Sequence, residues 1–195
     1  MERVVLASAN PRKVSELREI LAASIDLVPR PPEVPDVVED ADTFVGNARL
    51  KASALVAVTG LASLADDSGL EVDALDGAPG VRSARYAGED ATDEENVAEL
   101  LAALAHHYRA AERQARFRCV VVLQRPDGSE VVAEGTAEGH IAPAPAGSGG
   151  FGYDPVFVPD AGDGRTFGEM TQGEKHAISH RGRALASLLA QLSDD

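Results

Sequence analysis

The stretch Leu64-Ala65-Asp66-Asp67-Ser68-Gly69-Leu70-Glu71-Val72 places two adjacent carboxylates and a hydroxyl inside an otherwise apolar run. The apolar residues 61–65 predict a buried strand that delivers Asp66 and Asp67 at its end. Two readings of this pair stay open. The carboxylates could cap a turn in which Ser68 and Gly69 make the bend. They could instead bind a hard cation, because Mg²⁺ prefers oxygen ligands and keeps coordination positions for phosphates and water.

The segments around this stretch alternate between strand and helix patterns. Strands are predicted at residues 4–7, 61–65, 115–123, 130–136 and 151–159, and helices at residues 11–21, 44–59, 93–104 and around 185–192. Asn10 and Thr43 suit helix N-caps, and residues 92–95 form a capping-box sequence. Residues 115–123 and 130–136 flank Arg125-Pro126-Asp127-Gly128 and predict a hairpin. Alternating elements followed by a hairpin predict an α/β domain with a mixed sheet.

Length and charge limit the possible partners. A chain of 195 residues suits one domain, of one or two lobes. Its formal net charge of −14 repels a phosphate backbone, so we expect no nucleic-acid polymer as partner, whereas small phosphate esters stay possible. No apolar run approaches the roughly 18 residues of a membrane span, and the N-terminal run is too short for a signal peptide. We therefore expect a cytoplasmic protein that does not contact membranes, with Cys119 as a core thiol.

A phosphate-binding loop is one of two readings of residues 8–13, SANPRK. A loop that leads from a strand into a helix presents free N–H groups and the positive end of the helix dipole, and Lys13 adds a full charge. Pro11 removes one donor, so binding would depend on Asn10, Arg12 and Lys13. The other reading is a plain capped helix. Glu39 lies in an acidic loop from which one carboxylate could reach a cation.

Aromatic residues gather in one glycine-rich segment, GGFGYDPVF, at residues 149–157. Only 4% of the chain is aromatic, yet this segment holds Phe151, Tyr153 and Phe157. A ring with an accessible face is a stacking platform for a base. Phe157 reads equally well as a core residue. Further on, Lys175, His180 and Arg181 gather hydrogen-bond donors at the start of the last predicted helix, where carbonyl oxygens and anions bind favourably.

Five motifs in this order resemble the inosine/xanthosine triphosphate pyrophosphatase family, and the match runs nearly end to end. They are SANPRK (8–13), Thr43-Phe44 with Asn47 and Ala48, DDSGLEVDAL with GAPGVRSARYAG (66–88), GGFGYDPVF (149–157) and EKHAISHRGRAL (174–185). The family hydrolyses dITP, ITP and XTP to the monophosphate and pyrophosphate. The resemblance implies one two-lobed α/β domain over residues 1–195, with a long central mixed sheet flanked by helices. It also implies an active site in the cleft between the lobes, and a homodimer.

The resemblance also assigns roles by motif. Ser8 to Lys13 would hold the triphosphate, with Ser8, Asn10 and Lys13 in contact, and Lys51 would lie near the phosphates. Asp67 and Glu39 would bind Mg²⁺, and Asp67, with Asp66 beside it, would accept the proton. Ser68 would touch the substrate. The nucleoside pocket would consist of Phe151, Gly152, Tyr153, Asp154, Lys175, His180 and Arg181. The chain departs from the family pattern at Gly46, where a glutamate is common, and in the loop before it, which lacks the usual Thr-Gly.

Two rival functions stay open at this point. A related pyrophosphatase with a preference for pyrimidine or modified bases would share the phosphate chemistry but not the base pocket. A non-catalytic nucleotide-binding regulator would keep these residues without turnover. A panel of substrates assayed for pyrophosphate release separates all three functions.

Overall fold

Six strands form one mixed sheet within residues 2–32 and 34–193, the part of the chain that the computed structural model describes. The order across the sheet is β2-β1-β3-β4-β5-β6. The elements are β1 (Arg3–Leu6), α1 (Pro11–Leu21), β2 (Asp26–Val28), α2 (Phe44–Thr59), β3 (Ala62–Val72), α3 (Asp93–Ala103), β4 (Gln114–Gln124), β5 (Glu130–Ile141), β6 (Phe157–Pro159), α4 (Gln172–Ile178) and α5 (His180–Ser193), with short 3₁₀ turns η1 (Asp73–Leu75), η2 (Gly80–Arg85), η3 (Ala110–Glu112), η4 (Asp154–Val156) and η5 (Phe167–Glu169). The α/β prediction with a mixed sheet is confirmed.

Contacts within the chain define two compact units. The first comprises Met1–Asp67, Cys119–Gly135 and Arg183–Asp195, and the second comprises Ser68–Arg118 and Thr136–Gly182. The boundary falls within β3, so Asp67 is the last residue of a segment of one unit and Ser68 the first of a segment of the other. Each unit has its own apolar core.

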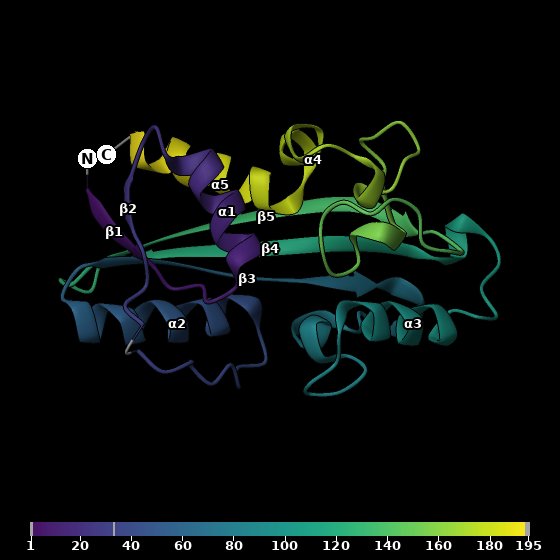
Figure 1. Ribbon diagram of the computed structural model, residues 1–195, viewed down its shortest axis with the longest axis horizontal. Coiled ribbons are helices and arrows are strands. Elements are labelled where there is room, and N and C mark those ends of the chain that lie inside the picture. Colours follow the sequence, from purple (N-terminus) through teal and green to yellow (C-terminus); the bar gives the residue numbers. More distant parts are fainter. Residues whose placement is uncertain (1, 33, 194–195) are drawn as a thin grey trace. The chain divides into compact units, whose positions relative to one another are not determined.

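In the first unit, helices cover both faces of the strands. Figure 1 shows α2 on one face and α1 and α5 on the other. β1 runs parallel to β2 and to β3, with Val4 opposite Leu27 and Ala62. Leu17 and Leu21 of α1 and Leu185 and Leu188 of α5 pack with buried strand residues in one cluster. Cys119 belongs to this cluster, as expected for a core thiol.

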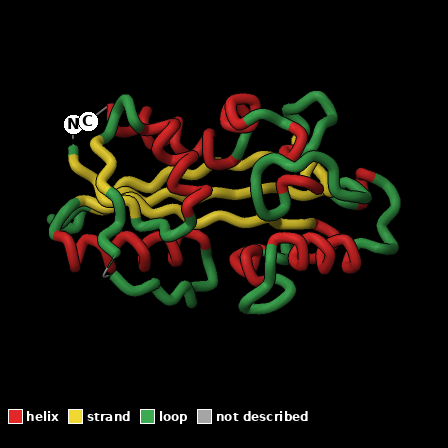
Figure 2. Tube along the Cα trace, viewed as in Figure 1, coloured by secondary structure: helices red, strands yellow, loops and turns green. Residues whose placement is uncertain are grey.

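The second unit has the same three-layer arrangement, with α3 on one face and α4 on the other (Figure 1). Its strands lie between these helices in the tube view of Figure 2. β6 pairs antiparallel with the end of β5, with Ile141 opposite Phe157. Phe117, Phe157 and Phe167 contact one another in the core, so Phe157 is a core residue rather than a stacking platform.

The predicted caps and the hairpin are confirmed. The Asn10 side chain caps α1, with Pro11 in its first turn, and Thr43 caps α2. Gly60 ends α2 with a φ of 65°, a left-handed conformation that glycine adopts without steric cost. Thr92 and Glu95 form the expected capping box of α3. Arg125 N–H donates to the Ser129 carbonyl at 2.9 Å in the turn between β4 and β5.

The prediction that Asp66 and Asp67 end a strand is wrong, and so is the bend at Ser68-Gly69. β3 continues to Val72, because Leu70 and Val72 have core positions that the extended chain must reach. Both aspartates therefore lie in the middle of a strand.

Two other predictions need correction. Residues 151–159 form a strand only at Phe157–Pro159, because Gly150 and Gly152 have φ values of 71° and 59° and turn the chain before it. Lys175 lies in α4, whereas His180 and Arg181 begin α5, since Ser179 between them has an extended ψ of 158°. These donors come from two helices rather than from the start of one. The short strand β2 was not predicted.

No helix among the described residues has both the length and the apolar character that crossing a membrane requires.

Candidate active site

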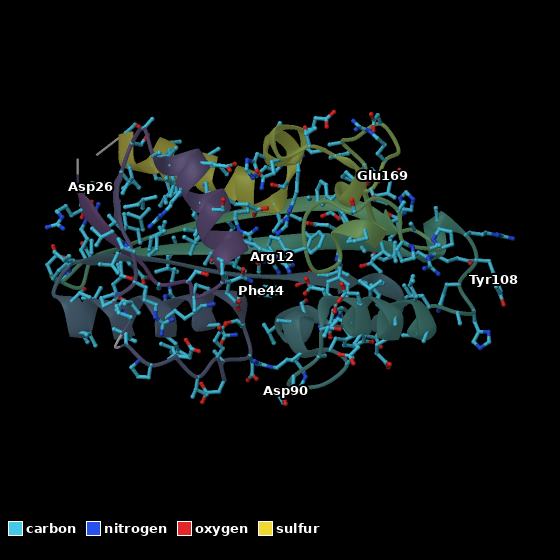
Figure 3. All side chains as sticks on the ribbon, viewed as in Figure 1. Arg12, Asp26, Phe44, Asp90, Tyr108 and Glu169 are labelled. Atoms are coloured by element: carbon cyan, nitrogen blue, oxygen red, sulfur yellow. The ribbon has the colours of Figure 1, made fainter. Side chains whose placement is uncertain are left out.

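Asp66 and Asp67 point to opposite faces of β3, because successive side chains of a strand alternate. Both carboxylates are buried. One therefore faces α1 and the other α2, and each meets a lysine from the helix on its side. Arg12 and Phe44, labelled in Figure 3, mark the beginnings of these two helices.

Lys13 of α1 lies against Asp66, with 3.3 Å between Nζ and Oδ2. The backbone ahead of it is a capped helix start, because the N–H groups of Arg12 and Lys13 donate to Asn10 Oδ1 at 2.9 and 3.3 Å. Asn10 N–H in turn donates to Ser8 Oγ at 3.2 Å. The predicted helix cap at residues 8–13 is thus present. The cap uses Asn10 Oδ1 and two of the amides, so a phosphate at this loop would draw on the Ser8 hydroxyl, the Asn10 side-chain NH₂ group and the Lys13 ammonium.

Two residues contact the Asp67 carboxylate, and a third contacts one of them. Asn47 Nδ2 donates to Oδ2 at 3.2 Å, and Lys51 Nζ lies 3.4 Å from Oδ1. Lys51 also donates to Glu39 Oε2 at 2.8 Å. Asn47 and Lys51 are four residues apart on α2 and so lie on one face of the helix. The predicted residues Glu39, Lys51 and Asp67 thus come together around one ammonium group.

The loop that carries Glu39 is tied to the same cluster through Asn47. The Ala41 N–H donates to Asn47 Oδ1 at 3.0 Å, so one asparagine contacts both this loop and Asp67. Upstream, Arg30 donates to the carbonyls of Val34 and Pro35 at 3.0 and 2.6 Å. Asn47 was part of the family motif but was not predicted as a site residue. Its spacing of four from Lys51 was the signal that could have identified it.

The electrostatics of this cluster are mixed. Burial raises the pKa of Asp67, and the attraction of Lys51 and Lys13 opposes that rise. Burial alone would lower the pKa of Lys51, but the surrounding carboxylates Asp67, Asp66 and Glu39 outweigh it and the net pKa rises. Lys51 is therefore charged at neutral pH, and its ammonium neutralises part of the acidic cluster.

The donor set fits Mg²⁺ bound together with a phosphate, rather than a closed protein cage. Among residues 2–32 and 34–193, no group of three or more His, Cys, Asp or Glu side chains is arranged to hold a metal. Glu39 and Asp67 do share one cation already, the Lys51 ammonium. Mg²⁺ commonly takes one or two carboxylates and completes its octahedron with water and substrate phosphates.

The second unit carries a cluster of donors around Phe151. Lys175 Nζ lies 4.9 Å from the centroid of the Phe151 ring, and Arg181 Cζ lies 5.7 Å from it. Both distances suit cation–π contacts. Arg181 also donates to Ser68 Oγ at 3.0 Å. The structure therefore brings Ser68, Phe151, Lys175 and Arg181 together, as the sequence predicted.

Asp154 holds two members of this cluster, Lys175 and Phe151, by hydrogen bonds. Its Oδ2 accepts hydrogen bonds from Lys175 Nζ and from the Phe151 N–H, both at 2.8 Å. The carboxylate is almost completely buried, so it positions the lysine and the ring. The backbone leaves room for it because residue 150 is glycine: a Cβ there would lie 2.0 Å from Asp154 Oδ2.

The remaining predicted residues make contacts with other parts of the second unit. The His180 ring stacks on Phe117 with 4.6 Å between centroids and 10° between planes. Tyr153 is buried and donates its hydroxyl to the Ser83 carbonyl at 2.9 Å, which makes it an anchor. Burial and nearby negative groups raise its pKa, so the hydroxyl keeps its proton. Gly152 N–H donates to Asp93 Oδ2 at 3.0 Å. Asp93 was missed, because a residue in the first turn of α3 gave no hint of this contact.

Comparison with models of protein families matches residues 4–191 to the Ham1 family. The chain belongs to the Ham1 family. A dITP/XTP pyrophosphatase from Streptomyces coelicolor is 50% identical over 97% of this chain and 96% of its own length. One from Erwinia tasmaniensis is 52% identical over 97% of this chain and 93% of its own length. These matches confirm the resemblance that the motifs indicated.

Solved structures of Ham1 proteins share the fold. A HAM1 protein from Coxiella burnetii superposes with a TM-score of 0.90 at 43% identity, over 100% of both chains. The Staphylococcus aureus Ham1 protein has a TM-score of 0.87 at 39% identity, over 99% of both chains. The Ham1 fold therefore holds for this chain from end to end.

Proposed function

We propose that this Ham1 protein hydrolyses the nonstandard purine nucleoside triphosphates dITP, ITP and XTP to the monophosphate and pyrophosphate, with Mg²⁺. The observation that carries this proposal is the Asp67 carboxylate, buried in mid-strand and held by Asn47 and Lys51 beside Glu39. The names of the relatives support the same substrate class. The reaction would remove noncanonical nucleotides from the pool in the cytoplasm.

The phosphate chemistry falls to residues of the first unit. Ser8, Asn10 and Lys13 would bind the triphosphate, and Lys51 would lie near its phosphates. Glu39 and Asp67 would hold Mg²⁺, which when bound supplies positive charge that stabilises the phosphate oxygens. Asp67 would accept the proton of the attacking water as the new bond to the α-phosphorus forms. The bond from that phosphorus to the bridging oxygen breaks, and pyrophosphate leaves with its charge partly balanced by Lys13. Asp66 would position Lys13.

Base selection would fall to Phe151 and the donors around it. Phe151 offers its ring for stacking, with Gly152, Tyr153 and Asp154 shaping the loop. Hypoxanthine and xanthine carry an acceptor oxygen at position 6, where adenine carries a donor amino group. The donors Lys175, His180 and Arg181 therefore favour the 6-oxo purines and oppose ATP.

A substrate panel tests the proposal. We expect Mg²⁺-dependent pyrophosphate release from ITP, dITP and XTP, and little from ATP or dCTP. Asp67→Asn should abolish this release while its circular dichroism and melting profile stay native, because the exchange removes charge without changing volume. Preferred turnover of a pyrimidine or methylated substrate would instead support the related pyrophosphatase. Tight ITP binding without turnover would support the non-catalytic regulator.

We also propose that the protein acts as a homodimer, as the family resemblance implies. Light scattering at assay concentrations measures this directly, and the mass of one 20.3 kDa chain would contradict it.

A further inference from the structure

The Lys51 ammonium contacts one oxygen of each of the two carboxylates that are proposed to hold a divalent cation. Nζ lies 2.8 Å from Glu39 Oε2 and 3.4 Å from Asp67 Oδ1, and the Lys51 and Asp67 side chains are only 11% and 10% exposed. The other Asp67 oxygen, Oδ2, accepts from Asn47 Nδ2. A cation that binds Glu39 and Asp67 through these oxygens must therefore displace the ammonium.

The net charge of the cluster determines what can stabilise the displaced ammonium. The carboxylates of Glu39, Asp66 and Asp67 face the ammoniums of Lys13 and Lys51, so these five side chains together carry one net negative charge, and four of them are at most 16% exposed. Adding a divalent cation makes the cluster net positive. Lys51 then lies beside a like charge in a region of weak screening, and it is stabilised only if an anion arrives with the cation.

We propose that Lys51 is an exchangeable counter-ion that couples divalent-cation binding to polyphosphate binding. Lys51 competes with a lone cation for Glu39 and Asp67 and so weakens its binding. When a polyphosphate arrives together with the cation, Lys51 moves from the carboxylates to a phosphate oxygen, and the competition ends. Cation and polyphosphate then bind more tightly together than apart, and by linkage each strengthens the other equally. The inference rests on the proposed function for its choice of ligands.

The alternative is that Lys51 is only a buried ion pair that holds α2 to the strand. Removing one partner of such a pair destabilises the fold, because it leaves the carboxylates without their counter-charge and repelling each other. That reading also gives tighter cation binding once Lys51 is removed, because the two carboxylates lose their counter-charge, but it predicts no change in the coupling between cation and polyphosphate. Counter-ion exchange predicts both tighter cation binding and a smaller coupling, so the coupling separates the two readings.

The experiment measures Mg²⁺ binding to the intact protein by calorimetry, with no nucleotide present. Lys51→Met and Lys51→Gln are compared with the wild type and with Arg49→Met. Arg49→Met also removes one positive charge from α2, but Arg49 pairs with Glu130 at 2.6 Å. We expect both Lys51 variants to bind Mg²⁺ about tenfold more tightly, and Arg49→Met to change the affinity little. Equal or weaker Mg²⁺ binding in the folded Lys51 variants overturns the proposal.

A second titration measures the coupling. Inorganic tripolyphosphate binding is recorded with and without Mg²⁺, and the ratio of the two affinities should shrink about tenfold in the Lys51 variants. An unchanged ratio overturns the proposal. Neither titration depends on turnover. A wild-type protein that fails to hydrolyse ITP would therefore contradict the proposed function alone, and the titrations would still distinguish the two roles of Lys51.

Discussion

Asp66 and Asp67 have different surroundings because successive side chains of a strand point to opposite faces of the sheet. Asp66 meets Lys13 on one face of β3, whereas Asp67 meets Asn47 and Lys51 on the other. Each carboxylate thus has a counter-charge, and this compensation is what allows a DD pair in a buried strand. Because both residues are aspartates, residue type alone does not distinguish their roles. The proposed division, with Asp66 positioning a lysine and Asp67 accepting the proton, follows from the face that each one occupies.

Asn47 should matter for activity without touching the substrate. Asn47→Leu removes the donor to Asp67 and the acceptor for the Ala41 N–H, so both Asp67 and the Glu39 loop lose a fixed partner. We expect kcat/KM for ITP to fall by about 10–100-fold, the usual range for groups that orient metal ligands. The control is Ser53→Ala. Ser53 lies in α2 like Asn47 but donates its hydrogen bond to Gln124 of β4, so this variant should keep near-normal kinetics. Equal losses in the two variants would contradict the role of Asn47.

The ring and the donors of the second unit should have separable effects on selectivity. Phe151→Ala should weaken ITP and ATP alike, by about 1–3 kcal/mol, because stacking does not depend on the 6-substituent. Arg181→Ala or Lys175→Ala should instead shrink the preference for ITP over ATP, since a donor aimed at the 6-oxo group helps one substrate and opposes the other. The measurement is the ratio of kcat/KM values for the two nucleotides, which is independent of the folded fraction. Selectivity lost only in Phe151→Ala would refute the assignment.

Short elements carry much of the site, and they are held by side chains at their ends. α4 has only seven residues, too few to be stable alone, yet it carries Lys175. Its capping box fixes it: Glu174 Oε2 accepts from the Thr171 N–H at 2.8 Å, and Glu174 Oε1 accepts from Arg165 at 2.8 Å. The Thr-x-x-Glu spacing of residues 171–174 is a local signal. The partner Arg165, nine residues away, is not part of it.

The cap of α4 should make stability depend on pH. Hydrogen bonds from Arg165 and then Thr171 lower the pKa of Glu174 from 4.5 to about 2. Because the folded state favours the charged form, this contribution is complete above about pH 4.5 and is lost as the pH falls toward 2. The melting temperature of the wild type should therefore exceed that of Glu174→Gln by a constant amount at neutral pH and converge with it in acid. Glu94→Gln, which removes an exposed carboxylate from α3, controls for the change in net charge. A difference that does not shrink in acid would contradict the cap.

Across the whole chain, the sequence predicted what depends on local pattern. The caps and the hairpin were predicted from residues close in sequence, and the proposed site residues came from motifs in register. The end of β3 was misplaced because Leu70 and Val72 are drawn into the core of the second unit, which no local rule reveals. The contacts of Asn47 with Asp67 and of Asp93 with Gly152 span 20 and 59 residues. Such pairs depend on the packing of elements, so the sequence alone did not predict them.

Arg113 joins distant parts of the second unit and offers the last test. Its buried guanidinium donates to the carbonyls of Ile141 at 2.7 Å, Leu104 and His107 at 3.1 Å, and Ala142 at 2.9 Å. It thus ties the end of α3 to the end of β5. Burial lowers the pKa of Arg113, but the guanidinium stays protonated, as arginine does in proteins.

Arg113→Met keeps the length of the side chain but removes every donor, so carbonyls at two element ends lose their partner. We expect the free energy of unfolding in urea to fall by about 3 kcal/mol, the effect of leaving buried acceptors unsatisfied. Arg116→Met, three residues further along the chain in β4, removes a partly exposed arginine that pairs with Asp73 and Glu138 at 2.9 and 3.0 Å. Exposed ion pairs contribute about 0–1 kcal/mol, so this matched variant should unfold near the wild-type urea concentration. If the two variants lose equal stability, the second unit is not held together through Arg113.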